Sequence, residues 1–387
     1  MNIQKGNRYK NMIYLDNAAT TFPKPPEVTN AACECMRKWC GNPGRGSHRL
    51  AIRASQALFD CREEASALFG LENSDNVVIT SNATYALNAA IFGLVGEGDH
   101  VIISDLEHNS VLRPVEFLRQ SRGVRYDIFS TGGDPCASVR KLIRPNTRAL
   151  ICTHSSNIVN RRLPAEELGL LCRRSGILFI LDASQSAGSV DINMKRDGIS
   201  ALCCAGHKGL LGPQGSGLAL FADGILPAPF AYGGSGINSL DIDMPEFLPD
   251  RLEAGTMATP AAAGLTEGIK YVRRRGADAI GKYEREICAR IHRKLSAHKE
   301  IRLYSAEGGA LCLFNVRGMT AQECAARLDE AGICVRAGLH CAPLAHKTVG
   351  TPEGGAVRAS VGPFSTAQEA DEFCSVLCGI AKNAGGI

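Results

Sequence analysis

Five short apolar runs in the first half of the chain are each followed at once by polar side chains. The runs are NVVIT (76–80), HVIIS (100–104), RALICT (148–153), ILFILD (177–182) and ALCCA (201–205). The polar side chains that end or follow them are Thr84, His108, Asn157, Asp182, Gln185, His207 and Lys208. Because ligands of open parallel sheets bind beyond the carboxyl ends of the strands, we expect these side chains to line one crevice.

This set of side chains suits pyridoxal phosphate. The cofactor needs a lysine to form a Schiff base and an acid to keep its pyridine nitrogen protonated, and Lys208 and Asp182 provide them. Its phosphate is best held at a helix N-terminus, where Thr84 would contact it together with His207. Two further contacts complete the set, with the ring stacked on His108 and the phenolic oxygen hydrogen-bonded to Gln185.

Each of these residues, taken alone, also has an ordinary structural interpretation. Lys208 could be a solvated surface lysine, and Asp182 and Thr84 could be helix caps. His108 could be a polar residue of a loop. Their joint placement favours the cofactor site. Phosphate loops rich in glycine are not supported, because no G-x-x-x-x-G-K-[ST] occurs and the G-x-G fragments at 44–46 and 234–236 lack the third glycine.

The elements that would position these residues form an α/β pattern. The apolar runs are short and continuous and alternate with helical stretches such as 165–174, which predicts a buried, mainly parallel sheet. GLALF (217–221) follows closely enough to be an antiparallel neighbour. Residues 226–259 are rich in Gly, Pro and Ser and are predicted to form long loops. Helical sequence then extends from about 261 to about 298.

The remainder of the chain predicts two or three short strands and two helices. We therefore expect a large domain over residues 14–264 and a small α+β domain over residues 265–387. Residues 1–30 are expected to pack with the small domain.

Composition excludes several classes of protein. The chain has 387 residues, 45% of them hydrophobic, and 43 Lys+Arg against 39 Asp+Glu give a net charge of +4. This charge gives no indication of a nucleic-acid or membrane partner. No apolar run approaches the ~18 residues of a membrane helix, and MNIQKGNRYKN lacks the apolar stretch of a secretory signal. We expect a cytoplasmic protein.

The cysteines also favour a reducing compartment. The 16 cysteines are about 4% of the residues, below the ~8–10% of a disulfide scaffold. Cys33, Cys35 and Cys40 form the one local cluster, with C-x-C-x4-C spacing. A metal site there is conceivable, but no histidine or fourth cysteine stands at ligand spacing. Incidental thiols on a helix are the favoured interpretation, and we expect no metal.

At these residues the sequence resembles the class V aminotransferase family, specifically its cysteine desulfurase and selenocysteine lyase group with the short catalytic-cysteine loop (type II). The resemblance spans nearly the whole chain, and GHKGLLGPQG together with RAGLHCAP is highly specific. The matching segments, in order, are YLDNAATTFPKP (14–25), TSNATYALNAA (80–90), EHNSV (107–111), HSSN (154–157), LDASQSAG (181–188), GHKGLLGPQGSG (206–217), YGGSG (232–236), PDRLEAGT (249–256) and VRAGLHCAPLAHKTVGT (335–351).

The resemblance implies a homodimeric fold-type I enzyme that uses pyridoxal phosphate, with a mainly parallel, seven-stranded sheet in its large domain. It implies the same roles for Lys208, Asp182, His108 and Gln185, with Asn157 as a second contact near the phenolic oxygen and near the substrate. Ala83, Thr84 and His207 would hold the phosphate, and Thr256 would reach the phosphate of the neighbouring subunit. Arg358 would grip the substrate carboxylate, a task that suits a fork-shaped guanidinium, with help from Arg336.

Cys341 matches the cysteine that attacks sulfur to form a persulfide. Its surroundings agree, since His340 is adjacent and Arg336 stands five residues before it, while Gly338 and Pro343 shape a loop. Cationic neighbours or a nearby base favour the nucleophilic thiolate.

Four positions depart from the family pattern. Ala205 stands where a hydroxyl is usual, and Met257-Ala258 and Ser365 replace a Pro-Asn pair and an Asn. Val159-Asn160-Arg161 replaces a Thr-Gly pair and adds bulk and a charge. None of these departures removes a catalytic group.

The expected activity is conversion of L-cysteine to L-alanine with a persulfide on Cys341. Three alternatives stay open. They are a selenocysteine lyase acting on L-selenocysteine, a C–S lyase on a larger sulfur amino acid, and a sulfur-donor subunit that is active only with an acceptor or carrier protein.

Overall fold

The computed structural model describes residues 12–44, 46–237 and 240–384. Residues 1–11, the first part of the segment expected to pack with the small domain, lie outside the described residues. The chain divides into two compact units. We call Pro23–Ser156 with Arg162–Ile280 the large unit, and the described part of Met1–Phe22 with Asn157–Arg161 and Gly281–Ile387 the small unit.

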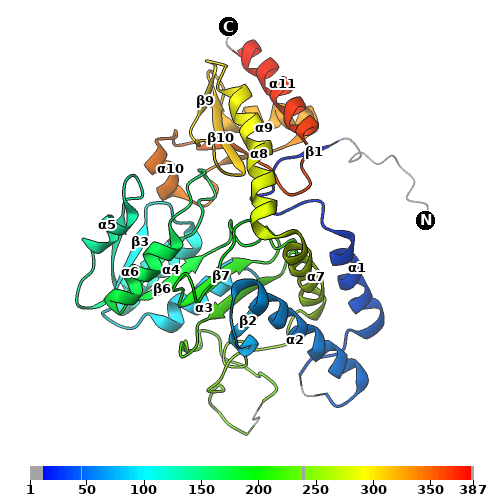
Figure 1. Cartoon of the computed structure of the whole chain (residues 1–387), viewed down its shortest axis with the longest axis vertical. Coiled ribbons are helices and arrows are strands. Elements are labelled where there is room, and N and C mark those ends of the chain that lie inside the picture. Colours follow the sequence, from blue (N-terminus) through cyan, green and yellow to red (C-terminus); the bar gives the residue numbers. More distant parts are fainter. Residues whose placement is uncertain (1–11, 45, 238–239, 385–387) are drawn as a thin grey trace. The chain divides into compact units, whose positions relative to one another are not determined.

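The large unit is built on a seven-stranded sheet with the order β2-β8-β7-β6-β5-β3-β4 (Figure 1). The strands in that order are β2 (Val77–Thr80), β8 (Gly217–Phe221), β7 (Ala201–Ala205), β6 (Leu178–Asp182), β5 (Thr147–Thr153), β3 (His100–Ser104) and β4 (Arg125–Phe129). Strand β8 runs antiparallel to both neighbours, and the other pairs are parallel. The predicted α/β class, the mainly parallel sheet and the antiparallel strand are confirmed.

Strand β4 was not predicted, and its position in the sheet explains why. It pairs only with β3 and therefore lies at the edge of the sheet. In its sequence, RYDIF, two residues are exposed, two are half-buried, and only Phe129 is buried. An edge strand buries less side-chain surface than a central one, so it lacks the continuous apolar run that marks the other strands.

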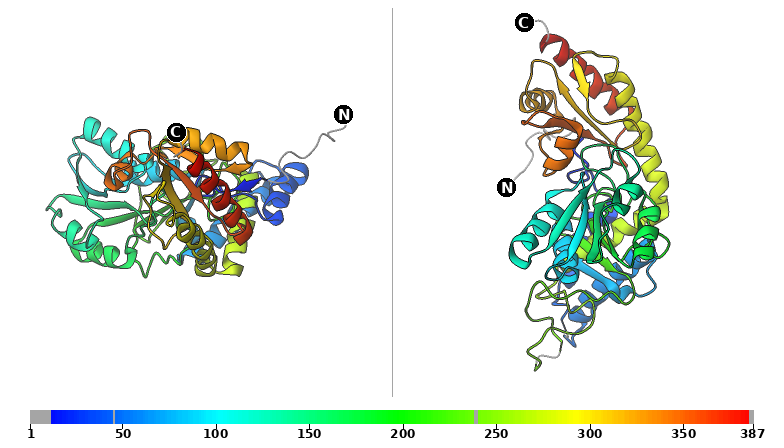
Figure 2. Two further views of the ribbon diagram at one scale, coloured as in Figure 1. Left: turned by 90° about the horizontal axis from the view of Figure 1, so that it is seen from above. Right: turned by 90° about the vertical axis from the view of Figure 1, so that its left-hand side faces the viewer.

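Helices cover both faces of this sheet, as the further views make plain (Figure 2). Helices α2 (Arg49–Phe69), α5 (Pro135–Arg140), α6 (Ala165–Ser175) and α7 (Thr259–Arg275) contribute to one apolar cluster, and α3 (Ala83–Leu94) and α4 (Asn109–Arg122) to the other. Within β3, Ile102 belongs to the first cluster and Val101 and Ile103 to the second. Successive side chains of a strand point to opposite faces, so a strand covered on both sides must be apolar throughout.

Other elements of the large unit lie at its N-terminal end and in its long loops. Helix α1 (Pro26–Glu34) runs into the π-helical turn η1 (Cys35–Trp39), so the cluster of Cys33, Cys35 and Cys40 lies around the end of a helix. A 3-10 turn, η2 (Ser74–Asn76), precedes β2. In the predicted loop region 226–259, the described residues up to Ala258 hold neither helix nor strand, and α7 begins at Thr259. All 16 cysteines are free thiols.

The small unit contains a four-stranded antiparallel sheet of order β12-β13-β10-β9. Its strands are β9 (Ile301–Leu303), β10 (Leu311–Val316), β12 (Arg336–Gly338) and β13 (Ala356–Ser360). The N-terminal strand β1 (Ile13–Tyr14) pairs with β11 (Ile333–Cys334). The helices are α9 (Ala321–Glu330), α10 (Pro343–Val349), α11 (Ala367–Ala384) and most of α8 (Ala277–Leu295).

This unit holds more elements than the sequence predicted. Five strands and three helices lie in the described chain after Lys299, because β11 and β12 have only two and three residues. Strands this short carry no apolar run of their own. The apolar cluster of the unit brings together the buried faces of α8, α9 and α11 with β10 and β13.

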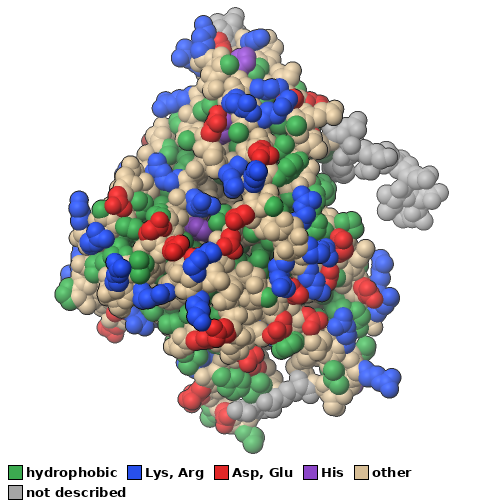
Figure 3. Space-filling model, viewed as in Figure 1, with side chains coloured by type: hydrophobic (Ala, Val, Ile, Leu, Met, Phe, Trp, Pro, Cys, Tyr) green, Lys and Arg blue, Asp and Glu red, His purple; other side chains and the backbone are tan. Residues whose placement is uncertain are grey.

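Lys and Arg side chains are intermixed with Asp and Glu on the visible face, without a large patch of one sign (Figure 3). Among the described residues, no helix combines the length and the apolar character that crossing a bilayer requires.

The turn after β7 depends on close approach of two backbone segments. A Cβ atom on Gly209 would lie 2.2 Å from the carbonyl oxygen of Ala187. We predict that Gly209→Ala lowers the free energy of unfolding by about 1–3 kcal/mol in urea denaturation, because a backbone segment must move. Gly133→Ala is the matched control, since its Cβ meets nothing within 4 Å. Equal stabilities of the two variants would contradict the prediction.

Candidate active site

Six of the predicted site residues lie at one edge of the seven-stranded sheet, at or just after the ends of its strands. Strands β3, β5, β6 and β7 run parallel, and β2 shares their direction because it is antiparallel to β8, which is itself antiparallel to β7. Their carboxyl ends therefore share one edge. The residues that end these strands or follow them within the large unit are Thr84, His108, Asp182, Gln185, His207 and Lys208.

Thr84 and His108 are joined by one hydroxyl. The Oγ of Ser110 lies 2.8 Å from Thr84 Oγ1 and 2.9 Å from His108 Nδ1. The backbone N–H of Ser110 donates to the same His108 Nδ1, at 3.1 Å. Since Nδ1 accepts this bond, the imidazole is neutral and carries its proton on Nε2. His108 is also the N-cap of α4. The sequence analysis had considered a capping role for Asp182 and Thr84, but not for His108.

Asp182 is a buried carboxylate at the end of β6. Its Oδ1 accepts the backbone N–H of Ser184 at 2.9 Å, as in a local turn. No described helix begins directly after Asp182, so this bond belongs to a local turn and not to a helix cap, and a turn of this kind fixes the direction of the side chain.

Glu107 is a second buried carboxyl group that the sequence analysis did not identify. Its side chain is 0% exposed, and its Oε1 accepts the N–H of Thr153 at 2.9 Å and the hydroxyl of Ser104. Among the described residues its Oε2 has no hydrogen-bond partner. Burial raises the pKa of Glu107 to about 8, and the nearby charge of Asp182 acts in the same direction. Glu107 is therefore protonated at neutral pH.

Lys24 is a second lysine beside the segment that carries Lys208. Its Nζ donates to the carbonyl oxygen of His207 at 2.7 Å, and burial lowers the pKa of Lys24 to about 8. The pKa of His207 is lowered to about 4 by burial and by the charges of Lys208 and Lys24. His207 therefore offers a neutral imidazole to an anion. In the sequence, the one signal for Lys24 is its position in the segment 14–25, which matches the family pattern.

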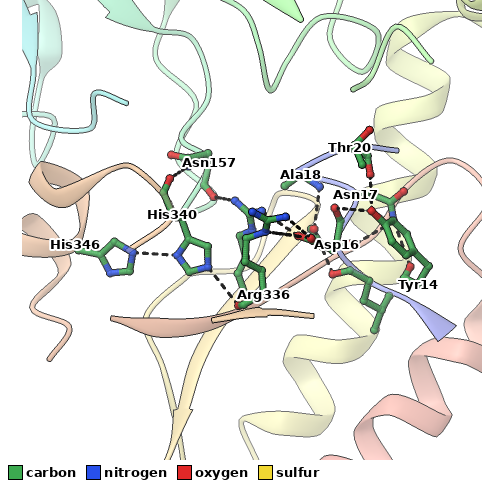
Figure 4. Close-up of polar contacts among 12 residues, drawn as sticks. Tyr14, Asp16, Asn17, Ala18, Thr20, Asn157, Arg336, His340 and His346 are labelled. Atoms are coloured by element: carbon green, nitrogen blue, oxygen red, sulfur yellow. Dashed lines mark hydrogen bonds and ion pairs between the residues drawn. The ribbon is translucent and has the colours of Figure 1, made fainter. Parts of the chain in front are cut away.

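The small unit carries a guanidinium pair that shares one carboxylate (Figure 4). Arg358 lies buried on β13 and donates to Asp16 Oδ1 at 3.2 Å and to the carbonyl oxygen of Asn157 at 2.9 Å. Arg336 donates from Nε to Asp16 Oδ2 at 3.0 Å. Burial lowers the pKa of Arg358, and Asp16 opposes this shift. Two cations against one carboxylate leave a net positive charge.

One nitrogen of this pair is available to an anion. Among the described residues, Arg358 Nε is a buried donor without a hydrogen-bond partner. An unpaired buried donor is costly unless a ligand satisfies it. Asp16 was missed by the sequence analysis, because its partners stand 320 and 342 residues away along the chain.

Asn157 belongs to the small unit, and so does the segment Val159-Asn160-Arg161 that departs from the family pattern. The amide nitrogen of Asn157 donates to the carbonyl oxygen of His340 at 2.9 Å. The amide nitrogen of Asn160 donates to the carbonyl oxygens of Ala306 and Leu311, at 2.7 and 2.6 Å. In this structure Asn160 therefore connects loops of the small unit.

Cys341 lies exposed in a strained turn of the small unit. The N–H of Ala342 donates to the carbonyl of Leu339 at 2.9 Å, and the two central residues, His340 and Cys341, have φ values of 51° and 55°. Positive φ at both central positions is typical of a type I′ turn, which favours glycine and asparagine. A non-glycine residue held there costs about 1–3 kcal/mol, and such residues occur at functional sites.

The two neighbours of Cys341 that the sequence analysis named, His340 and Arg336, differ in charge. Burial lowers the pKa of His340 to about 3, and the charge of Arg358 contributes. His340 is therefore uncharged at neutral pH and provides no cation to the thiolate, which corrects the expectation from the sequence. Arg336 does interact electrostatically with Cys341.

The remaining predicted residues lie in simpler settings. Ala83 is the first residue of α3, and Thr256 is exposed in the loop before α7. Of the departures, Ala205 is buried at the end of β7. Ser365 Oγ accepts the N–H of Gly362, and its carbonyl accepts the hydroxyl of Tyr283.

Comparisons with known proteins agree over almost the whole chain. The family model Aminotransferase class-V matches residues 13–373. A probable cysteine desulfurase of Methanothermobacter thermautotrophicus is 33% identical, with 92% of each chain covered. One of Pyrococcus abyssi is 31% identical over 96% of this chain and 95% of that protein. The apo structure of a cysteine desulfurase from Thermococcus onnurineus NA1 superimposes with a TM-score of 0.88 at 29% identity, covering 96% of this chain and 95% of that one.

The buried Glu107 predicts a pH dependence of stability. The folded protein keeps the proton of Glu107 up to about pH 8, whereas the ordinary pKa is 4.5, so stability falls as pH rises between these values. Glu107→Gln cannot titrate. We predict that thermal denaturation shows the variant gaining at least about 2 kcal/mol over wild type between pH 5 and pH 8.5. Parallel pH profiles would contradict a protonated Glu107.

Proposed function

The chain belongs to the class V aminotransferase family, and on this premise we propose that it is a pyridoxal-phosphate-dependent cysteine desulfurase. The proposed reaction converts L-cysteine to L-alanine and leaves the sulfur on Cys341 as a persulfide. The observation that carries the proposal is the placement of Asp182 at the end of β6 and of Lys208 three residues after the neighbouring strand β7, together with an exposed Cys341 in a strained turn.

The residues present fit the cofactor. Asp182 is a buried acid suited to the pyridine nitrogen, and Lys208 is an amine at the same sheet edge. Thr84 lies in the first turn of a 12-residue helix whose N-terminus favours a phosphate. We propose that Ala83, Thr84 and His207 hold the phosphate, that the ring lies against His108, and that Gln185 and Asn157 contact its polar edge.

When bound, pyridoxal phosphate supplies a sink for the electron pair that forms at the substrate Cα. Lys208 then has the task of removing and returning a proton at Cα and Cβ. Asp182 keeps the proton on the pyridine nitrogen, because a buried carboxylate stabilises a positive charge beside it. Glu107 is neutral and therefore adds no charge that would compete with Asp182.

Arg358 is proposed to bind the substrate carboxylate. Its buried guanidinium has an unpartnered Nε within the described chain, and its Nη2 and Nη1 are held by Asp16 and by the carbonyl oxygen of Asn157. Arg336 shares Asp16 and is proposed to assist. A substrate carboxylate would balance the net positive charge of this group.

Sulfur transfer needs a nucleophile. The thiolate of Cys341 attacks the substrate sulfur, the C–S bond breaks, and protonation of the carbon gives alanine, while Cys341 keeps the sulfur as a persulfide. Because Cys341 is exposed, we propose that an acceptor protein or a small thiol collects this sulfur.

We further propose a cytoplasmic homodimer. Tyr232, Leu240 and Ile242 of the loop region are 76%, 98% and 102% exposed, which a second copy of the chain would cover. Thr256 lies exposed in the same region and is proposed to reach the phosphate of the neighbouring subunit. The 16 free thiols support a reducing compartment.

The first test is Cys341→Ser. The variant should bind pyridoxal phosphate with unchanged affinity and release alanine from L-cysteine at least ~100-fold more slowly, because a truncated nucleophile costs several kcal/mol of barrier. An amino-acid panel scored for alanine, sulfide, selenide and pyruvate accompanies it. Full turnover of the variant on L-cysteine would exclude the persulfide. Turnover confined to L-selenocysteine, or pyruvate as product, would indicate a lyase.

The second test is Thr256→Ala. We predict weaker retention of pyridoxal phosphate in equilibrium dialysis, by roughly tenfold, because one charge-assisted hydrogen bond is lost. Secondary structure and thermal stability without cofactor should not change. A monomeric wild type with full activity in analytical ultracentrifugation would contradict the shared site.

A further inference from the structure

A chain of hydrogen bonds runs through the loop that carries Cys341, inside the small unit. His346 Nδ1 lies 2.8 Å from Thr351 Oγ1, and His346 Nε2 lies 3.1 Å from His340 Nδ1. His340 Nε2 lies 3.3 Å from the carbonyl oxygen of Arg336 (Figure 4). The two imidazole planes differ by 6° with centroids 5.4 Å apart, so the rings lie edge to edge and the bond follows the in-plane lone pair.

One carbonyl group determines which atom donates and which accepts in every bond of this chain of hydrogen bonds. A carbonyl only accepts, so His340 carries its proton on Nε2 and accepts at Nδ1. His346 must then donate from Nε2 and accept at Nδ1 from the hydroxyl of Thr351. Burial lowers the pKa of His340 to about 3 and that of His346 to about 4, so both rings are neutral at physiological pH, as this arrangement requires.

This chain of hydrogen bonds holds the turn at 339–342 in a conformation that the residues of the turn do not favour. His340 and Cys341 both have positive φ, a conformation that L-residues rarely adopt unless their surroundings impose it. Three hydrogen bonds fix His340. Its ring donates to the carbonyl oxygen of Arg336 and accepts from His346, and its own carbonyl oxygen accepts from Asn157. His346 is 2% exposed on α10 and provides one of these bonds.

We infer that His346, through His340, is a positioning residue that holds the Cys341 turn in its reactive conformation. This inference rests on the proposed desulfurase function. It assigns no proton transfer to the histidines. Both ring nitrogens of His340 are occupied, and the chain ends on a carbonyl that cannot take a proton, so neither ring acts as a base toward Cys341.

The test compares His346→Leu, His346→Gln and Thr351→Val in the cofactor-loaded enzyme. Leucine removes the bond to His340, whereas the amide of glutamine can restore the donor near the position of Nε2. We expect His346→Leu to lower kcat for alanine release at least tenfold with KM within twofold of wild type. His346→Gln should recover to within threefold of wild type, and Thr351→Val should fall between them. Lys347→Ala, an exposed neighbour on α10, is the matched control.

Two measurements separate positioning from other roles. Iodoacetamide should alkylate Cys341 at the wild-type rate in every variant, since the thiol stays exposed and its chemistry is unchanged. Amide hydrogen exchange of residues 339–342 should accelerate in His346→Leu and return toward wild type in His346→Gln. Thermal denaturation identifies a variant that fails to fold, and Thr351→Val then replaces it.

Several results would overturn the inference. They are an unchanged kcat in His346→Leu, an equal loss in the leucine and glutamine variants, or an alkylation rate that falls with kcat. If no variant, wild type included, forms alanine from L-cysteine, the proposed function fails. The exchange measurement still decides whether His346 holds the turn.

Discussion

Burial of the seven-stranded sheet on both faces is the constraint on which the rest of the large unit depends. Strands covered on both sides must be apolar throughout, so ionisable groups are displaced to the ends of the strands. Two carboxyl groups are buried at these ends, Asp182 and Glu107, and each accepts a backbone and a hydroxyl hydrogen bond through one of its oxygens. The chemistry is concentrated at the carboxyl edge for this reason.

Burial also decides which side chains carry charge. The pKa values of His207, His340 and His346 are lowered to about 4, 3 and 4, chiefly because each imidazole loses contact with water. These histidines therefore act as neutral hydrogen-bonding groups. Positive charge comes from Arg336 and Arg358, which share Asp16 and stay charged because guanidinium hardly loses its proton in proteins. In the proposed function, the arginines therefore carry the charge that binds an anionic substrate, and the histidines contribute hydrogen bonds without charge.

The sequence predicted those features that depend on local pattern. Continuous apolar runs identified six of the seven sheet strands, and the order of strand-end residues predicted which side chains share an edge. The polar edge strand β4 carries no such run. Lys24, Asp16, Glu107 and His346 were also missed. Each is an ordinary polar residue until a partner is known, and for Lys24 and Asp16 that partner stands at least 183 residues away in the chain.

At three residues, a strained backbone conformation occurs together with a side chain that glycine could not replace. Leu211, His340 and Cys341 are the non-glycine residues with positive φ in the described chain, and they lie in the two loops that carry Lys208 and Cys341. Glycine would relieve each of them. At Leu211, full burial of an apolar side chain offsets the strain. At His340 the ring makes its hydrogen bonds, and at Cys341 the thiol is the group proposed to take the sulfur. The unfavourable backbone is therefore retained where a side chain does work that glycine cannot do, and bonds such as that from Asn157 to His340 hold it in place.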